Sequence, residues 1–399
     1  MKTSRSVCLD LSRTVARADQ TVRTGIDRVE LAYLDRFLSD SSRLVHGLVR
    51  LRGGHVLLDR QALVRLRSDL ERRHRRGFSG QNRLGLRRRL LLQGFVPRPF
   101  LARKVAQRLS PDVWYVNVGH TDFGDRVVEA FGGLPGARIA VMLHDVIPLT
   151  HPQFQRPGIP QRFARMLNRV VASADLVICN SGHTEADLRR ILIGKERLPE
   201  TCVAPLGVVT APPSLHVPGQ IDLERPVFTC IGTLEPRKNH ALLLDVWEQM
   251  ERRLPPSDVP QLAVIGRRGW ADPSLFRRID RMQVGGASIH EFNAMQDGQV
   301  TTLLQASAGL LFPSQAEGFG LPGVEAAALG VPVICSPLPV LRETLRAYPT
   351  YVATGAPGPW RRAIQCRARA WMEGDRGLRA PHKVPTWRDH FNIVLSRLC

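Results

Sequence analysis

Two carboxylates in the C-terminal half are spaced to suit hydroxyl groups beside a bound phosphate. Glu317 and Glu325 have seven residues between them and belong to QAEGFGLPGVEAAA, residues 315–328, which follows the apolar segment AGLLFPS. Gly318 and Gly320 let the backbone curl tightly into a helix, whose first amides and positive dipole end favour phosphate. Because carboxylates repel phosphate but pair with hydroxyls, the segment predicts a phosphate that carries a sugar and a ribose. The alternative is an ordinary strand-to-helix turn with a surface glutamate.

A pair of cations follows a second apolar segment. In CIGTLEPRKNH, Cys230–His240, Gly232 permits close approach of the backbone, and Arg237 and Lys238 stand where the next helix begins. Cations beside helix-start amides neutralise a diphosphate leaving group as charge develops on it. Lys238 is one of five lysines against 51 arginines, so a drift toward arginine does not account for it. The alternative is a basic helix cap on the surface.

A histidine and an aspartate follow an apolar segment in the N-terminal half. HDVIP, residues 144–148, comes directly after ARIAVML. At the end of a strand, His144 and Asp145 are candidates to contact a substrate hydroxyl or to support proton transfer. The alternative is a structural histidine.

The segment TGIDRVE, residues 24–30, opens an early helix. Gly25 would let the first amides of that helix meet a diphosphate or an acceptor hydroxyl. This first turn lacks a G-x-G-x-x-G fingerprint, and the chain has no G-x-x-x-x-G-K-[ST] segment. Both absences argue against NAD-dependent and P-loop chemistry.

The elements that must position these loops alternate between strands and helices over most of the chain. That alternation predicts an α/β protein of two Rossmann-like, doubly wound domains facing across a cleft, with ligands at the carboxyl ends of the strands. We expect one domain over 1–209, a proline-rich linker over 210–226, a second domain over 227–385 and a terminal helix over 386–399. The expected strands are Val7–Leu11, Arg43–Leu51, Val113–Val118, Arg138–Leu143, Asp175–Cys179, Cys202–Pro205, Val227–Ile231, Gln261–Ile265, Ala287–His290, Ala308–Phe312 and Pro332–Cys335. The expected helices are Gly25–Leu38, Ala62–Arg76, Arg87–Leu109, Gln161–Ala174, Thr184–Ile193, Ala241–Leu254, Asp297–Gln305, Leu321–Leu329 and Trp387–Leu398.

Length and composition fit a globular protein that is large enough to bury hydrophobic cores. The chain has 399 residues, of which 43% are hydrophobic and 23% charged, which excludes wholesale disorder. No apolar stretch is long enough to cross a bilayer, and the first residues lack the apolar region of a secretory signal. Seven cysteines without C-x-x-C spacing favour a reduced, cytoplasmic chain over a disulfide framework or a zinc site.

The net charge of +20 is concentrated in one segment. Residues 60–108 hold fifteen basic residues and two acidic ones, a pattern that favours phosphate-bearing partners such as nucleic acid, an anionic membrane face or lipid-linked phosphates. Six apolar residues among them are candidates to lie on a membrane surface: Leu90, Leu91, Leu92, Phe95, Phe100 and Leu101. The alternative is a solvated helical face whose leucines pack on the core.

Taken together, GTLEPRKNH and FPSQAEGFGLPGVEAAALGVPVICSPLPVLRE closely resemble the C-terminal donor domain of glycosyltransferase family 4. The segments TGIDRVE, HDVIPLTHP and CNSGHTEADL resemble its mannosyltransferase-like branch, which assembles bacterial surface polysaccharides. The resemblance covers most of the chain, but little of 52–110 and 345–385. It implies a GT-B fold and a retaining enzyme that uses a nucleotide sugar. The domain over 1–209 would then bind the acceptor, and the domain over 227–385 the nucleotide-sugar donor.

Roles follow from the resemblance position by position. Glu317 would face the transferred sugar and Glu325 the ribose hydroxyls, while Arg237 and Lys238 match the family's diphosphate-binding pair. The amides of 319–321, that is of Phe319, Gly320 and Leu321, would cap the same diphosphate, and His144 matches a histidine near the sugar and the acceptor. We therefore expect Glu317 and His144 to be catalytic, and Gly25 and Asp145 to lie on the acceptor side. Family members commonly need no metal, so no metal or other cofactor is expected.

The sequence thus predicts transfer of a hexose, with GDP-mannose favoured, to a glycan or a polyprenyl-diphosphate-linked acceptor. Residues 60–108 would hold the enzyme at the inner face of the cytoplasmic membrane. One alternative is another GT-B sugar-nucleotide enzyme, such as an epimerase. A nucleic-acid-binding protein is less favoured, because the basic segment lacks nucleic-acid motifs and the loops with chemistry lie elsewhere.

Overall fold

The chain forms two compact units in a computed structural model that describes residues 6–20, 22–76, 83–120, 123–214, 216–286, 288–377 and 379–398. The first unit is made of Met1–Val146, Pro160–Leu206 and Trp387–Cys399, and the second of Ile147–Ile159 and Gly207–Thr386. This division differs from the expected one, because 147–159 groups with the second unit and the C-terminal helix with the first. No described helix is both long and apolar enough to cross a membrane.

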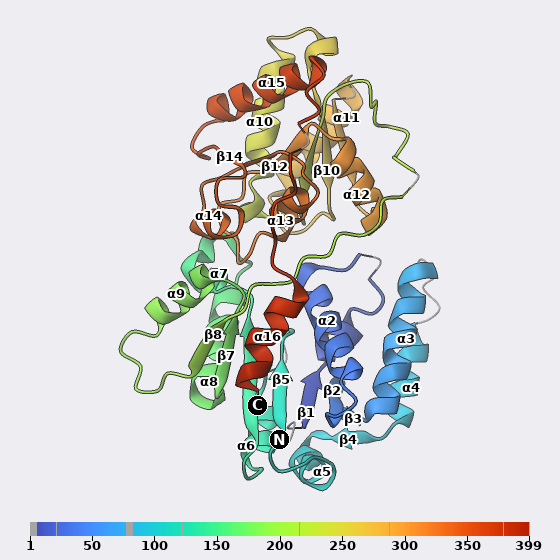
Figure 1. The fold of residues 1–399 in the computed structure, drawn as a ribbon, viewed down its shortest axis with the longest axis vertical. Coiled ribbons are helices and arrows are strands. Elements are labelled where there is room, and N and C mark those ends of the chain that lie inside the picture. The colour runs from blue at the N-terminus through green and yellow to red at the C-terminus, as the bar shows by residue number, and fades with distance from the viewer. Residues whose placement is uncertain are drawn as a thin grey trace. The chain divides into compact units, whose positions relative to one another are not determined.

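An eight-stranded sheet of order β4-β3-β2-β1-β5-β6-β7-β8 forms the centre of the first unit (Figure 1). Its strands are β1 (Val7–Asp10), β2 (Val45–Leu51), β3 (Gly54–Leu58), β4 (Phe95–Pro97), β5 (Trp114–Asn117), β6 (Arg138–Leu143), β7 (Leu176–Cys179) and β8 (Glu200–Val203). Neighbouring strands are parallel except that β3 pairs antiparallel with both β2 and β4. The helices are α1 (Ser12–Ala16), α2 (Gly25–Ser39), α3 (Arg60–Arg76), α4 (Arg83–Leu92), α5 (Leu101–Arg108), α6 (Asp125–Gly132), α8 (Ile159–Ser173), α9 (Gly182–Ile191) and α16 (Trp387–Arg397).

The antiparallel edge corrects the sequence prediction. The single helix expected over Arg87–Leu109 is wrong: α4 ends at Leu92, β4 follows, and α5 begins only at Leu101. Pro97 and Pro99 explain the break, because proline cannot continue a helix interior. The β2–β3 hairpin turns at Arg52 and Gly53, and that Arg-Gly-Gly signal between apolar runs was available in the sequence.

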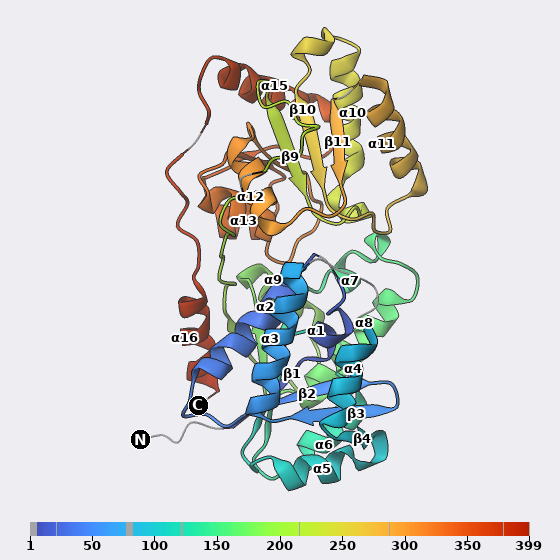
Figure 2. The ribbon, with the colours of Figure 1, turned by 90° about the vertical axis from the view of Figure 1, so that its right-hand side faces the viewer.

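The second unit contains a six-stranded parallel sheet of order β11-β10-β9-β12-β13-β14. The strands are β9 (Val227–Ile231), β10 (Gln261–Ile265), β11 (Ile289–Phe292), β12 (Gly309–Phe312), β13 (Val333–Cys335) and β14 (Thr350–Tyr351). The helices are α7 (Ile147–Thr150), α10 (His240–Glu251), α11 (Pro273–Gly286), α12 (Asp297–Ala306), α13 (Leu321–Ala328), α14 (Pro339–Leu345) and α15 (Pro357–Met372). Figure 2 shows α10 and α11 on one side of this sheet and α12 and α13 on the other.

Alternation along the strands explains these two layers. In β9, Phe228 and Cys230 pack in a cluster with α10, α11 and α15, whereas Val227 packs in a second cluster with α12. Strand side chains point to opposite faces in turn, so each apolar strand serves both layers. Helix α15 escaped prediction because arginines interrupt its apolar face, although Trp360, Ile364, Ala368 and Trp371 recur at helical spacing and are buried.

The proline-rich segment 210–226 is attached to the second unit. The Ser214 amide donates to the Gly298 carbonyl at 3.1 Å, and the Thr302 hydroxyl donates to the Ser214 carbonyl at 2.7 Å. Ile221 is buried in the cluster that contains α12. The segment is therefore a packed extension of the second unit rather than a free tether.

Helix α16 is fixed to the first unit by a buried histidine. The His390 ring contacts the carbonyl oxygens of Ala204 and Pro205 through Nδ1 at 3.1 Å, and the Tyr33 hydroxyl through Nε2 at 2.8 Å. These contacts join the end of the chain to α2 and to the segment after β8.

Candidate functional site

The second unit brings the two strongest sequence signals together. Strands β9 and β12 are parallel neighbours in the sheet, so the loops that follow them lie side by side at its carboxyl edge. The Gln315 amide donates to the Arg237 carbonyl at 2.7 Å and joins the two loops directly. Gly232 is required here: its φ is 148°, and a Cβ would stand 3.2 Å from Lys238 Cε.

A buried cluster of charges joins these loops. Lys238 Nζ donates to Glu317 Oε1 at 2.5 Å, and Arg237 Nη1 donates to Glu317 Oε2 at 2.9 Å. Arg237 also donates to the Ala316 carbonyl at 2.8 Å and pairs with Glu235 at 2.6 Å. Both oxygens of the Glu317 carboxylate therefore meet a cation, in a place that is almost closed to solvent.

The cations determine the ionisation of Glu317. Burial alone would raise the pKa of this carboxyl, but the charges of Lys238 and Arg237 outweigh burial and lower its pKa to about 2. Glu317 is consequently a carboxylate at neutral pH. Lys238 Nζ also lies 4.8 Å from the centre of the Phe312 ring, where the face of the ring attracts a cation.

Helix α13 begins beside this cluster, as the glycine loop predicted. Gly320 precedes it in the left-handed conformation with a φ of 84°, and a Cβ there would stand 2.5 Å from Leu341 Cδ2. Phe319 is buried, Gly318 and Leu321 are half-buried, and Glu325 is half-buried in the second turn of α13. The first amides of a helix have no partner within it, so this end of α13 suits an anion.

Sequence reasoning missed two members of the cluster. Glu235 pairs with Arg237, and Phe312 carries Lys238 on its ring. Glu235 stands two residues before Arg237 in the same motif, and Phe312 is the last residue of β12, so both were visible signals. Among the described residues, no three His, Cys, Asp or Glu side chains are grouped to hold a metal ion.

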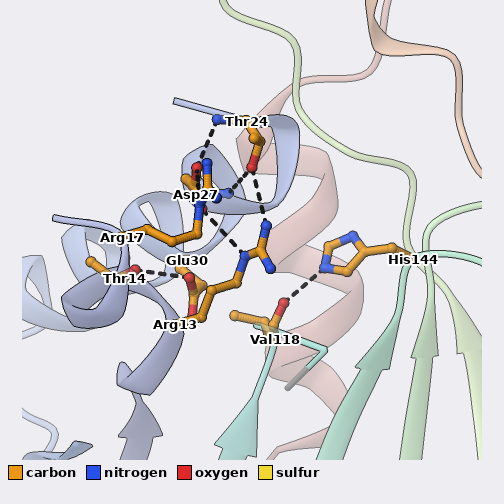
Figure 3. A network of polar contacts seen from close by, with 8 residues as sticks. All are labelled: Arg13, Thr14, Arg17, Thr24, Asp27, Glu30, Val118 and His144. Atoms are coloured by element: carbon orange, nitrogen blue, oxygen red, sulfur yellow. Dashed lines mark hydrogen bonds and ion pairs between the residues drawn. The ribbon is translucent and has the colours of Figure 1, made fainter. Parts of the chain in front are cut away.

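The first unit places His144 at the carboxyl end of β6. His144 Nε2 lies 2.7 Å from the Val118 carbonyl oxygen. Because a carbonyl only accepts, the proton is on Nε2. Burial and the neighbouring His120 lower the pKa of His144 to about 3, so the ring is neutral and Nδ1 is an acceptor. In Figure 3 the second ring nitrogen points away from Val118. Asp145 is half-buried beside it.

A second histidine lies beside His144. The ring centres of His120 and His144 are 5.7 Å apart, and burial followed by the charge of Arg13 lowers the pKa of His120 to about 4. His120 adopts a left-handed backbone with a φ of 58°, uncommon for a non-glycine residue. It stands just after β5, as His144 does after β6, so its position was a usable signal that sequence reasoning missed.

The start of α2, expected to offer amides to a ligand, is internally satisfied. The Thr24 amide donates to Asp27 Oδ2 at 2.7 Å, the Asp27 amide donates to Thr24 Oγ1 at 3.4 Å, and Gly25 lies between them. Figure 3 shows Arg13 and Arg17 converging on the Asp27 carboxylate, at 3.3 and 3.0 Å. A carboxylate at this helix start disfavours a diphosphate, so of the two ligands expected at Gly25 the acceptor hydroxyl fits better.

A second buried glutamate lies below this network. Glu30 is fully buried in α2 and accepts a hydrogen bond from the Thr14 hydroxyl at 2.8 Å. Within the described part of the chain its Oε1 atom has no hydrogen-bond partner, and a Cβ on Gly119 would stand 2.5 Å from that atom. Burial raises the pKa of Glu30 well above its usual range, against the smaller effects of Thr14 and Arg13.

The part of the chain that contains the charged cluster of the second unit matches one known protein family. Residues 214–357 match the family "Glycosyl transferases group 1". This stretch contains β9 to α14, so Arg237, Lys238 and Glu317 all lie in the part of the chain that is similar to this family.

Curated relatives point the same way. The serotype-specific mannosyltransferase WbdA of Escherichia coli is 28% identical over 277 residues, which are 66% of this chain and 34% of WbdA. The O-antigen chain mannosyltransferase B of Escherichia coli is 29% identical over 215 residues, which are 52% of this chain and 55% of that protein. The chain thus spans about a third of the length of WbdA.

Solved structures establish the fold. Sucrose-phosphate synthase from Thermosynechococcus elongatus has a TM-score of 0.61 at 17% identity, over 99% of this chain and 94% of its own. Anabaena HepE, in its complex with UDP and glucose, has a TM-score of 0.60 at 16% identity, over 98% and 95%. The chain has the GT-B type of fold, with two α/β domains, as the sequence predicted.

Proposed function

We propose that this chain is a retaining glycosyltransferase of family 4. It transfers a hexose from a nucleotide diphosphate sugar to a hydroxyl of a glycan or of a polyprenyl-diphosphate-linked acceptor. The reaction serves surface polysaccharide synthesis at the cytoplasmic side of the membrane. Mannose, carried by GDP, is the favoured sugar, because the curated relatives are named as mannosyltransferases.

The observation that carries the proposal is the convergence of Lys238 and Arg237 on Glu317 beside the start of α13. A sugar nucleotide has an anionic diphosphate next to a polyhydroxyl ring, and this cluster offers cations and a carboxylate side by side. The cations and the first amides of α13 stabilise charge on the departing diphosphate. Glu317, which stays ionised because of its cations, accepts hydrogen bonds from sugar hydroxyls.

The site performs the transfer by charge stabilisation and positioning. In the proposed step, the bond between the anomeric carbon and the phosphate oxygen breaks, and the acceptor oxygen bonds to the same face of that carbon. The acceptor proton passes to the departing phosphate oxygen, so charge and atoms balance without a protein base. Glu317 orients the sugar, and neutral His144 accepts a hydrogen bond from a hydroxyl through Nδ1.

In this proposal the other predicted site residues have the following roles. The backbone at Gly232, Gly318, Phe319, Gly320 and Leu321 lies along the diphosphate, and Glu325 takes the ribose hydroxyls. Gly25 and Asp145 belong to the acceptor side. The proposed chemistry needs no metal, because Arg237 and Lys238 supply the positive charge.

Thermal stabilisation by nucleotide sugars tests the donor site. Wild type and Lys238→Ala are melted with GDP-, UDP-, dTDP- and ADP-sugars, and a selective ligand at a hundredfold excess over its Kd adds about 2.7 kcal/mol to stability. We expect one base to stabilise the wild type and to lose its effect in Lys238→Ala. Arg278→Ala is the matched control, because Arg278 pairs with Asp245 and Glu248 between α10 and α11. This control should keep the ligand effect.

Product analysis tests the reaction. NMR of the glycoside formed on a lipid-diphosphate or glycan acceptor should show the anomeric configuration of the donor. An inverted product would overturn retention, and conversion of the sugar nucleotide without any acceptor would favour an epimerase. If no nucleotide sugar stabilises the wild type, with or without acceptor, the donor site is refuted.

A further inference from the structure

The antiparallel edge of the first unit exposes large apolar side chains. Leu91 and Leu92 at the end of α4 are 44% and 85% exposed, Phe95 in β4 is 38% exposed, and Phe100 before α5 is 56% exposed. Folded proteins normally keep such side chains apart or covered. Here four of them occur within ten residues of chain.

Buried neighbours and strand pairing attach the backbone of this apolar group to the domain. Leu90 and Leu101 flank it in sequence and are 4% and 1% exposed, so they anchor α4 and α5 to the domain. Strand β4 pairs with β3 through Val96 and His55. The Phe95 ring lies over Gly54, where a Cβ would stand 2.7 Å from it. The alternative that the sequence left open was that the leucines of this segment pack on the core. That is correct for Leu90 and Leu101, but Leu91 and Leu92 are exposed.

Cations surround the same edge. Arg87 and Arg88 on α4, Arg98 after β4 and Arg103 on α5 are exposed. Across the described chain, Arg88, Arg98 and Arg103 form no ion pair with an acidic side chain. The positive charge on this edge is therefore not neutralised locally.

The neighbouring helix α3 is different, although it belongs to the same basic segment. Arg67 pairs with Asp35 and Glu71, and Arg72 pairs with Asp69. Arg89 of α4 joins the same group through Asp69 at 3.2 Å. The two acidic residues of the basic segment, Asp69 and Glu71, both lie on α3, so the part of the segment beyond α3 contains cations only.

A shallow cavity lies within the edge. Its volume is about 220 Å³, and it is lined by Gly94–Pro97, Phe100, Arg103, Lys104 and Gln107. Aromatic rings and cations thus share one concave surface. This combination matches the boundary of a bilayer, where acyl chains meet phosphate headgroups.

We propose that the surface formed by Leu91, Leu92, Phe95, Phe100 and the cations Arg88, Arg98 and Arg103 binds anionic phospholipid membranes. We call it the β4 edge. The apolar side chains enter the acyl boundary, the cations meet lipid phosphates, and the cavity holds one headgroup. Helix α3 stays outside the contact. This inference does not rest on the proposed chemistry, because vesicle binding requires no sugar nucleotide.

Vesicle co-sedimentation tests the β4 edge. The full chain is mixed with vesicles of phosphatidylglycerol and phosphatidylcholine, or of phosphatidylcholine alone, at several salt concentrations. We expect binding to the anionic vesicles that weakens as salt rises. Leu92→Ser and Phe100→Ser should each weaken it about tenfold. Arg98→Gln and Arg103→Gln should each weaken it about fivefold.

Matched controls come from the opposite edge of the same sheet, next to β8. Ile193 is 79% exposed there, and Arg190 is exposed and paired with Asp187. Ile193→Ser and Arg190→Gln should bind vesicles like the wild type. The four side chains substituted in the β4 edge and the two control side chains are all exposed. Melting curves verify that each variant is folded.

Other outcomes would overturn the inference. Equal binding to neutral vesicles, or equal losses in the Ile193 and Phe100 variants, would show adhesion without a defined surface. Tight binding to duplex DNA that Arg103→Gln reduces, without vesicle binding, would assign the surface to nucleic acid. Concentration-dependent dimers that Phe100→Ser dissolves, again without vesicle binding, would assign it to a second copy of the chain. Failure here would leave donor-induced stabilisation unchanged, so it is distinguishable from failure of the proposed function.

Discussion

Glu317 in the second unit and Glu30 in the first are both buried glutamates, yet their pKa values shift in opposite directions. Glu317 meets a cation at each carboxylate oxygen, and its pKa falls to about 2. Glu30 meets one hydroxyl and has one oxygen without a hydrogen-bond partner among the described residues, and its pKa rises well above the usual range. Burial removes the hydration of both carboxylates and by itself raises the pKa of each. The neighbouring cations or hydroxyls therefore decide in which direction each pKa finally shifts.

The same rule separates the two sets of strand-end loops. In the second unit, the buried Lys238 side chain meets the Glu317 carboxylate and the face of the Phe312 ring. In the first unit, burial lowers the pKa of both His120 and His144; the charge of Arg13 lowers the first further, and the nearby His120 lowers the second. The loops of the second unit thus carry cations and those of the first neutral imidazoles, as the proposed donor and acceptor sides require.

Replacing the carboxylate of the second unit should have the largest effect. In Glu317→Gln, Lys238 loses its counter-charge and Arg237 keeps only Glu235, and we expect the free energy of unfolding to fall by about 3 kcal/mol. Transfer should fall about 100-fold, because the sugar loses its ionised partner. Binding of the nucleoside diphosphate alone should strengthen, since Lys238 becomes available to it. Chemical denaturation, product assays and calorimetry measure the three quantities. Unchanged transfer would contradict the role of Glu317.

A histidine variant tests whether the first unit works through neutral groups. With its pKa at about 3, His144 is a poor base at neutral pH. We therefore expect His144→Gln to lower kcat/KM only about tenfold, the equivalent of about 1.4 kcal/mol and within the range of one hydrogen bond. The pH–rate profile of the wild type should show no step near pH 6.5 that the variant removes. A loss of about 1,000-fold together with such a step would instead identify His144 as a general base.

The lowered pKa of His144 also predicts how the stability of the protein depends on pH. An unfolded histidine gains its proton near pH 6.5, whereas folded His144 resists it down to about pH 3. Its neutral form therefore contributes fully above about pH 6.5, and the protein loses stability as pH falls from there toward 3. Melting temperatures of the wild type and His144→Gln should converge over this range if the variant folds normally.

The smallest effect is expected at Glu30. Glutamine imitates a protonated carboxyl, so Glu30→Gln should change stability by no more than about 1 kcal/mol at acidic pH. Because the folded pKa of Glu30 is raised, the wild type loses stability as pH rises from the usual glutamate range toward that pKa, and the variant does not. The variant should become relatively more stable as pH rises. Melting the two proteins across pH measures this, and a constant difference would show that Glu30 is ionised.

Prediction from sequence succeeded best where one local signal specified one element. The strand at Val227–Ile231 has the same bounds in the structure, and the expected helix over Leu321–Leu329 ends one residue earlier. A proline and a left-handed glycine fix the start of α13, and an apolar run fixes β9. The strands expected at Cys202–Pro205 and Ala287–His290 lie two residues away from those positions.

Prediction failed where contacts between segments that are distant in the sequence determine the local structure. Strands β3 and β4 are short; β3 pairs with β2 and β4 pairs with β3, and this pairing gives the two strands after Leu51 their extended form. Residues Arg87–Leu109 contain good helix formers, so only the prolines and this pairing reveal the interruption. The network of Arg13, Asp27 and Glu30 joins α1 to α2 and was invisible as a motif.

The sequence by itself determined the chemistry available to this protein. Arg237, Lys238, Glu317 and the glycine before α13 are all legible as motifs, because each lies within a few residues of a strand end. Only the tertiary structure decided the ionisation of Glu317 and which parts of the basic segment stay exposed. An ionisable group responds to partners that are distant in the chain: Lys238 and Glu317 meet only because β9 and β12 are neighbours. Arg67 and Arg72 of α3 pair with acidic side chains, whereas across the described chain Arg88, Arg98 and Arg103 of the β4 edge do not.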